Sequence, residues 1–292
     1  MMITFIIPIL IIILLPEDVY AWGVGIHIME GSYVLENLQL ILPSMADVLR
    51  TFPMDYLYGC ISADIFIGKG ERRKDDHCHN WSVGQKILSL ATSDIETAFS
   101  YGYLSHLASD IIAHNFYIPN QLYSTSSNRG LGHIYWELRS DEYTARRHWK
   151  LAREVINRHN GHNDGVMQEV IPKKLVSFKA KKRIYSRAIE INDLILWRKA
   201  IAIIAKNSRW DVGQDYIEYL NSLSINLILD LFQNIEDAVC LKFDPIGSEN
   251  IKAAKEKKKI IYGRTIPMES LFDIPEEITT LSPKNRYFVS SN

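Results

Sequence analysis

The sequence is short of several features that would assign it to a class at once. It has 3 cysteines in 292 residues, too few for a disulfide-dense scaffold. Its 33 basic and 34 acidic residues give a net charge of −1, without the basic excess typical of a generic nucleic-acid binder. With 47% hydrophobic residues it is too apolar for a disordered chain. Composition therefore indicates a globular protein and leaves its function open.

Several familiar catalytic motifs are also missing. The chain contains no HExxH, no GxSxG and no P-loop. It has neither the ExxH pair of carboxylate di-iron bundles nor the adjacent His-Asp of another class of helical metal phosphohydrolases. Gly23-x-Gly25 lacks the third glycine and the preceding strand of a dinucleotide-binding turn. These absences exclude the corresponding types of site.

The longest hydrophobic run is too short to cross a bilayer. Residues 3–15 are almost all Ile, Leu, Phe or Pro, whereas a transmembrane helix needs about 20 apolar residues. The run has the length of a signal-peptide apolar region, and Val19 and Ala21 precede a plausible cut. We predict a signal peptide over 1–21, cleaved before Trp22, although no Lys or Arg precedes the run. An uncleaved anchor is the alternative.

Cleavage would make this an exported protein: periplasmic, secreted or associated with the envelope. Such compartments are oxidising, so disulfides are expected there. Three cysteines cannot all pair within one chain, and Cys60 and Cys78 are candidates for one bond.

Hydrophobic periodicity predicts helices and hardly any strands. Phe99, Tyr103, Leu107 and Ile111 form one apolar stripe at helical spacing. The segments predicted to be helical on this basis are 26–41, 99–116, 134–156, 184–205 and 216–232.

We therefore predict an all-α, single-domain helical bundle over residues 22–292. It consists of a ligand core (22–143), additional helices (144–262) and a loop-like tail (263–292). The Ser-, Asn- and Gly-rich segment 115–132 is the expected internal loop.

Two lysine-rich clusters stand in the second half of the chain. The first consists of Lys173, Lys174, Lys179, Lys181, Lys182 and Arg183, and the second spans 252–259. The ordinary interpretation of such runs is a solvated helix face. Contact with anionic lipid headgroups is the functional interpretation.

Residue types that bind metals recur at helical spacing. His106, Asp110 and His114 stand at i, i+4 and i+8, which places them on nearly one face of a helix. His133 and Glu137 repeat the i, i+4 spacing on the next predicted helix. Isolated histidines are more often core residues, but separate clusters with ligand spacing rarely arise by chance. His148, His159 and His162 are therefore assigned no role.

Further candidates precede this cluster in the sequence. They are Asp64, the pair His77 and His79, and His27, five residues after Trp22. Imidazole nitrogens and carboxylate oxygens are suitable zinc ligands. A cut before Trp22 would also free an α-amine that forms a chelating pair with its own carbonyl oxygen.

The arrangement predicts more than one metal ion. Asp110, with histidines on both sides, is placed to bridge two ions. Two metals about 3.5–4 Å apart form the clamp used for in-line displacement at phosphorus. The pattern therefore indicates phosphoester chemistry.

Taken together, these residues resemble the zinc-dependent phospholipase C family, which is related to the single-strand-specific zinc nucleases. The resemblance covers about 22–143 and implies an all-α fold with a trinuclear zinc site whose first ligand is the mature N-terminal Trp. The residues that carry it are Trp22, His27, Asp64, His79, His106, Asp110, His114, His133 and Glu137.

The resemblance also implies how the residues divide among up to three Zn²⁺ ions. The three groups are Trp22, His27 and Asp110; His79, His106 and Asp110; and His114, His133 and Glu137. Asp64 would lie beside the metal-bound water as base or orienting group, and could itself ligate zinc. Asn80-Trp81 favours His79 over His77, although strand geometry alone does not choose between them.

The details mix features of two substrate classes. Trp22 and His27 have the nuclease-like interval, whereas His133-x3-Glu137 is the phospholipase-like version. The leading hypothesis is an exported zinc phosphodiesterase, a phospholipase C that cleaves a glycerophospholipid at a membrane surface into diacylglycerol and a phosphorylated headgroup. No protein partner is inferred.

Two alternatives remain at this stage. The first is a nuclease or nucleotidase that uses the same ions, with nucleic acid stacking on Trp81, Trp136 or Tyr117. The second is a non-catalytic envelope protein stapled by zinc.

Overall fold

The computed structural model describes residues 22–66, 77–124, 131–171, 176–206, 212–261 and 271–282. These segments are predominantly helical and contain no β-strand, so the all-α prediction is confirmed. The predicted signal peptide (1–21) lies outside the described residues, as do 263–270 and 283–292 of the predicted tail. The described part of that tail includes the short helix α15 (Glu276–Thr279).

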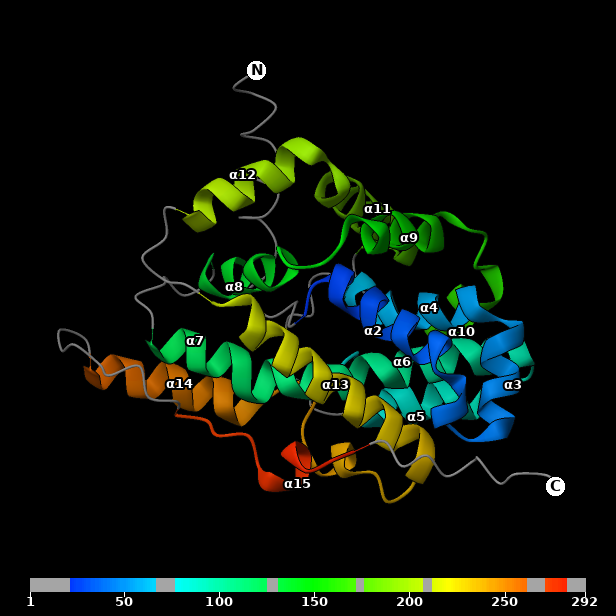
Figure 1. Ribbon diagram of the computed structural model, residues 1–292. Helices are drawn as coiled ribbons and strands as arrows, with labels where there is room; N and C mark the ends of the chain where they lie inside the picture. Colours follow the sequence, from blue (N-terminus) through cyan, green and yellow to red (C-terminus); the bar gives the residue numbers. More distant parts are fainter. Residues whose placement is uncertain are drawn as a thin grey trace.

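The centre of the molecule is α6 (Asp94–Ile112), with α4 (Pro53–Ser62), α5 (Trp81–Ser89) and α13 (Gln214–Asn234) packed against it (Figure 1). From residue 98 onwards every residue of α6 except Tyr101 is buried. A helix that is covered all round needs no polar face, which explains its mixed apolar and small-residue sequence. The side chains on α6 that belong to metal-binding residue types therefore face protein rather than solvent.

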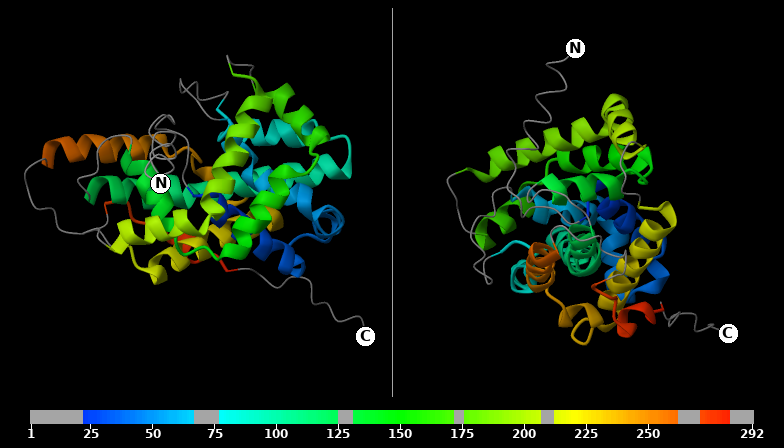
Figure 2. Two further views of the ribbon diagram at one scale, coloured as in Figure 1. Left: turned by 90° about the horizontal axis from the view of Figure 1, so that it is seen from above. Right: turned by 90° about the vertical axis from the view of Figure 1, so that its left-hand side faces the viewer.

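The remaining helices surround this centre. Figure 1 places α11 and α12 above α8 and α9, and both views of Figure 2 show α14 running along α7. Their bounds are α2 (Val24–Glu36), α3 (Pro43–Thr51), α7 (Ile118–Ser124), α8 (Leu131–Asp141), α9 (Arg146–Asn157), α10 (Gly161–Val170), α11 (Phe178–Asp193), α12 (Ile195–Lys206) and α14 (Ser248–Ile261).

Helices α4 and α6 approach each other through two glycines. A Cβ at Gly59 would lie 2.0 Å from the Phe99 carbonyl oxygen, and one at Gly102 would lie 1.9 Å from the Tyr56 carbonyl oxygen. Only a residue without a side chain permits this backbone contact. Since Gly102 lies one turn before His106, the contact also sets the position of that imidazole.

The single continuous helix predicted over 134–156 is wrong. It is divided into α8 and α9 by residues 142–145. The Thr144 N–H donates to the Asp141 carbonyl, and the turn brings Thr144 and Trp149 against Gly25. Packing on α2, rather than local propensity, ends α8.

The helix predicted over 184–205 is also interrupted. Leu194 has extended backbone angles (φ −67°, ψ 128°), so α11 ends there and α12 follows. The side chain of Leu194 is exposed.

The internal loop predicted over 115–132 is wrong up to Ser124 and again at 131–132, where α8 begins. A π-helical turn (Ala113–Tyr117) continues α6 and leads into α7, and 125–130 lie outside the described residues. The Asn115 side chain donates to the carbonyls of Ile111 and Asp244, which holds this turn to distant backbone.

The cysteines and the first basic cluster also differ from expectation. Cys60 is a free buried thiol, so the pairing considered with Cys78 is not formed. Lys181 is buried with its Nζ 5.8 Å from the centre of the Phe66 ring, and Lys182 forms a 2.8 Å ion pair with Asp164. These two lysines therefore support the fold instead of a solvated face.

The other basic residues are only partly described. Lys179 and Arg183 are exposed on α11, as are Lys252 and Lys257 on α14. Lys173, Lys174 and the side chains of 258–259 lie outside the described residues. Among the helices of the described segments, none is long and apolar enough to cross a membrane.

The contact between α4 and α6 predicts that Gly102→Ala is strongly destabilising. Overpacking a core typically costs about 1–3 kcal/mol, and a backbone clash lies at the upper end. The matched control is Gly165→Ala on α10, where a Cβ meets nothing within 4 Å. Alanine there gains up to about 1 kcal/mol of helix propensity. Thermal unfolding of the two variants measures the difference, and equal melting temperatures would contradict the proposed contact.

Candidate metal centre

A buried carboxylate, Asp110, stands inside a ring of four imidazoles. Its Oδ1 lies 3.3 Å from His27 Nε2. Its Oδ2 lies 3.1 Å from the Nε2 atoms of both His79 and His106, and 3.8 Å from that of His114. All five residues are buried. The Asp110 carboxylate therefore faces His27, His79, His106 and His114, all of which the sequence analysis assigned as metal ligands.

The second carboxylate of the cluster is Asp64. It lies in the 3₁₀ turn Ala63–Ile65 that follows α4. Its Oδ1 is 3.2 Å from His79 Nε2 and 3.9 Å from His106 Nε2. Asp64 thus lies beside the same two imidazoles that contact Asp110 Oδ2.

Four separate stretches of chain supply these groups. His27 comes from α2, Asp64 from the 3₁₀ turn after α4, His79 from the turn before α5, and His106 and Asp110 from the last turns of α6. His114 lies in the π-helical turn that continues α6. Single π-turns occur often at functional sites, because the added residue changes which side chains face inward.

The hydrogen-bonding pattern fixes which nitrogen of His106 is free to bind a ligand. Its Nδ1 lies 2.9 Å from the Cys60 carbonyl oxygen, which can only accept, so Nδ1 carries the proton. Nε2 is therefore the nitrogen that faces Asp110 and His79 Nε2, the latter at 2.9 Å, and it can bind a cation once it has released its proton. This is the tautomer of a metal-binding histidine whose other nitrogen donates to a carbonyl.

The donor atoms present fit zinc. Both oxygens of Asp110 are buried and accept no hydrogen bond from the described residues, a costly condition that a cation would relieve. Ligand atoms within 4.8 Å of one another form three triads around it. These triads are His27, His106 and Asp110; Asp64, His79 and His106; and His79, Asp110 and His114.

The protonation states also suit a metal. Burial raises the pKa of Asp110, but His106 and the imidazoles of His27 and His79 outweigh it and hold that pKa well below its usual value. Burial, with His106 nearby, lowers the pKa of His27. A charged carboxylate beside neutral imidazole is the state that binds a cation.

Comparison with known proteins now decides the family. A family model described as zinc-dependent phospholipase C matches residues 26–189, more than half of the chain. The chain belongs to the zinc-dependent phospholipase C family. It is therefore a zinc-dependent hydrolase of the phosphodiesterase class. Neither a curated protein nor a solved structure gives a significant match.

Within this phospholipase C family member, the structure separates the two candidate histidines of residues 77–79. His79 contacts both Asp64 and Asp110. His77 turns back on the chain, where its Nδ1 accepts the His79 N–H at 3.2 Å. The arrangement favours His79 as the ligand and gives His77 the role of holding the turn.

Trp22 is fixed in the core at the start of the described chain. Its ring is fully buried and stacks on Tyr117 with centroids 5.2 Å apart, and its Nε1 donates to Ser224 Oγ at 3.2 Å. The family match begins after Trp22. The role of its amine and carbonyl as zinc ligands stays a prediction.

The third group of predicted ligands is only partly placed. Glu137 is buried on α8, and none of the triads formed by described residues includes it. His133 lies on the same helix, but its side chain lies outside the described residues. Their joint role with His114 therefore stays a prediction.

The sequence analysis missed Glu30. Its Oε2 lies 3.9 Å from His27 Nδ1 and accepts the Ser109 hydroxyl, and burial raises its pKa to about 8. The i, i+3 spacing from His27 on α2 was the available signal. A carboxylate behind a metal-binding histidine orients the ring.

Removing the central carboxylate tests the centre directly. We expect Asp110→Ala to lose at least one zinc equivalent per chain, because the imidazoles around it would lose their shared anionic ligand. Elemental analysis of purified protein measures the loss. The exposed His159→Ala is the control and should keep the wild-type zinc content. Unchanged zinc in Asp110→Ala would refute the assignment.

Glu30→Ala tests the support behind His27. Loss of such an outer partner typically weakens metal affinity by about 10–100-fold. Competition with a chromophoric chelator measures the affinity. Glu30→Gln keeps an acceptor for the Ser109 hydroxyl and is uncharged, as Glu30 with a pKa of about 8 mostly is at neutral pH, so it should retain more of the affinity; equal loss in both variants would contradict a role through this hydrogen bond.

Proposed function

We propose that this family member is an exported phospholipase C. It would hydrolyse a glycerophospholipid at a membrane surface to diacylglycerol and a phosphorylated headgroup. The observation that carries the proposal is the Asp110 carboxylate facing four imidazoles, with Asp64 alongside. That donor set, in a chain of this family, supports hydrolysis at phosphorus.

We propose that up to three zinc ions bind here. Two of the described triads share Asp110, as the predicted sets around His27 and His79 do, but they group His106 with His27 and His114 with His79. The third set rests on His114, His133 and Glu137. Zinc in such a site polarises a phosphoryl oxygen and lowers the pKa of a bound water towards about 7.

Asp64 is the residue we assign to proton handling. It is buried in a 3₁₀ turn and held within 3.2 Å of the His79 imidazole, so its carboxylate keeps one position. A carboxylate fixed beside the reacting centre can orient the attacking water and take its proton. The four imidazoles around Asp110 and Asp110 itself would hold the ions and exclude bulk water from them.

Asp64→Asn separates this role from metal binding. General acid–base groups typically contribute about 10²–10⁴-fold, so kcat for a short-chain phosphatidylcholine should fall by that order. The zinc content should stay above half of the wild-type value. A variant that keeps wild-type turnover would remove Asp64 from the mechanism, and one that loses most of its zinc would make it a ligand.

We further propose that cleavage before Trp22 completes the centre. The Trp22 ring, anchored between Tyr117 and Ser224, would bring a new α-amine next to α2. Mass spectrometry of the exported protein identifies the mature N-terminus. Protein that retains one added residue before Trp22 should bind fewer zinc equivalents than the mature chain; equal binding would argue against a chelating amine.

The nuclease alternative receives less support. Tyr117 and Trp136 are buried, with the Tyr117 hydroxyl donating to the Trp136 carbonyl, and Trp81 donates to the Phe243 carbonyl. The rings of Tyr117 and Trp136 are held in the core and that of Trp81 is partly buried, whereas stacking of bases needs an open face. Parallel assays with phosphatidylcholine and single-stranded DNA should show turnover of the lipid. Faster turnover of DNA would reverse the choice of substrate.

A further inference from the structure

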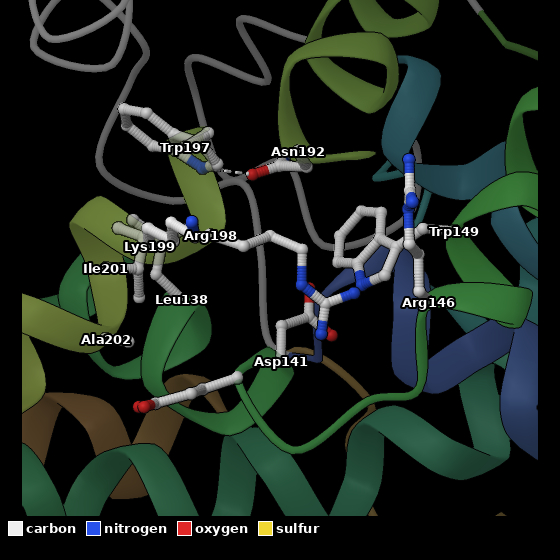
Figure 3. Close-up of a pocket in the computed structure, with 11 residues that line it drawn as sticks. Leu138, Asp141, Arg146, Trp149, Asn192, Trp197, Arg198, Lys199, Ile201 and Ala202 are labelled. Atoms are coloured by element: carbon white, nitrogen blue, oxygen red, sulfur yellow. Dashed lines mark hydrogen bonds between the residues drawn. The ribbon is translucent and has the colours of Figure 1, made fainter. Parts of the chain in front are cut away.

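A cavity of about 400 Å³ lies between α8, α9, α11 and α12, apart from the ring of imidazoles (Figure 3). None of the histidines around Asp110 lines it. Its lining combines cationic, acidic and aromatic side chains. The residues that matter for its chemistry are Asp141, Arg146, Trp149, Trp197, Arg198 and Lys199.

The cationic end of the cavity centres on Arg198. Its Nη2 donates to the Thr144 carbonyl at 2.8 Å, which fixes the guanidinium in place. Its Nη1 is buried and has no hydrogen-bond partner among the described residues. Figure 3 shows this side chain reaching between Asp141 and Trp149. A buried, fixed and unsatisfied N–H donor is costly unless something binds it.

The carboxylates of the lining are engaged elsewhere. Asp141 Oδ1 accepts the Ile26 N–H at 3.2 Å, and Glu142 lies 3.3 Å from Arg139 Nε. Neither acid takes the free hydrogen of Arg198 Nη1, although Asp141 lies close to it.

A second group of cations adds to the positive charge. Arg146 and Arg153 both contact the single carboxylate of Asp193, at 3.4 and 3.2 Å. Lys199 is exposed on the same helix as Arg198. Arg153 does not line the cavity, so the cations of its lining are Arg146, Arg198 and Lys199, against the carboxylates of Asp141 and Glu142.

Two tryptophans form part of the walls. Trp149 is buried on α9, and Trp197 is held by a 2.7 Å hydrogen bond from its Nε1 to Asn192 Oδ1. Both rings are therefore rigid. Their flat surfaces suit a small organic group next to an anion.

We propose that this cavity is a second binding site, for a phosphate-type oxyanion held by Arg198 with help from Lys199. The planar guanidinium presents its N–H groups in the geometry that phosphate oxygens accept. The anion could be inorganic phosphate or the phosphate of a small phosphorylated headgroup, which would add contact with Trp149 and Trp197. The site is separate from the metal centre and does not depend on the identity of the lipid substrate.

Tryptophan fluorescence and calorimetry of the zinc-loaded chain test this site. The probes are inorganic phosphate and phosphoethanolamine. We expect saturable binding that weakens by about 10-fold or more in Arg198→Gln, which loses a charged hydrogen bond. Arg187→Gln is the matched control, because Arg187 is exposed on α11 and pairs with Glu190. It should bind as the wild type does.

Binding at zinc is distinguished by the same variants. Phosphate held only by the metals would bind equally well to Arg198→Gln, and that result overturns the proposal. Zinc content and phosphodiester turnover are measured for each variant, so a failure of the proposed enzyme activity is seen separately. Trp197→Phe should reduce the fluorescence response while calorimetry still detects binding.

Further variants settle the source of the anion and guard against misfolding. Tighter binding of phosphoethanolamine than of phosphate, lost in Trp197→Ala, supports a headgroup; equal binding supports free phosphate. If Arg198→Gln is unstable, Lys199→Gln replaces it, since Lys199 is exposed. A several-fold loss of affinity in that variant supports the site, and unchanged affinity overturns it.

Discussion

The charge of Asp110 is the constraint on which the rest of the structure depends. A fully buried carboxylate costs several kcal/mol unless cations or donors compensate it. Here the compensating groups are imidazoles from α2, from the turn before α5, from α6 and from the π-helical turn. Zinc ions between these side chains would turn a costly arrangement into a favourable one, so metal binding and folding of the core would be coupled.

Elements far from the ligands hold them in register. The glycine contact between α4 and α6 sets the depth of His106, and Gly247, at a φ of 62°, lets the start of α14 lie against His114. A Cβ at Gly247 would be 2.2 Å from the His114 carbonyl oxygen. Ser224 of α13 joins Trp22 to the Ser109 carbonyl. The second half of the chain thus serves as a scaffold for candidate ligands that all come from the first half.

The sequence was informative where local pattern decides the structure. Helical periodicity predicted the α-class, and the spacing of His106, Asp110 and His114 predicted one ligand face. It could not predict the π-helical turn or the break after Asp141, because these depend on Asp244 and Gly25, which are distant in sequence. Glu30 was missed for a related reason: its position beside His27 looks like any helix residue until Ser109 is placed next to it.

Asp141 shows why one such break matters. Gly23, the residue before helix α2, supplies no side-chain cap, and the Asp141 carboxylate accepts the Ile26 N–H in its place. A Cβ at Gly23 would overlap this carboxylate, so a larger residue there would displace the Asp141 side chain from its present position. Burial raises the pKa of Asp141 to about 7 against the opposing effects of the Ile26 N–H and Arg198, so the charged cap is costly. The Asp141 carboxylate fixes the position of the first turn of α2 and hence of His27. The same side chain also lines the cavity that contains Arg198.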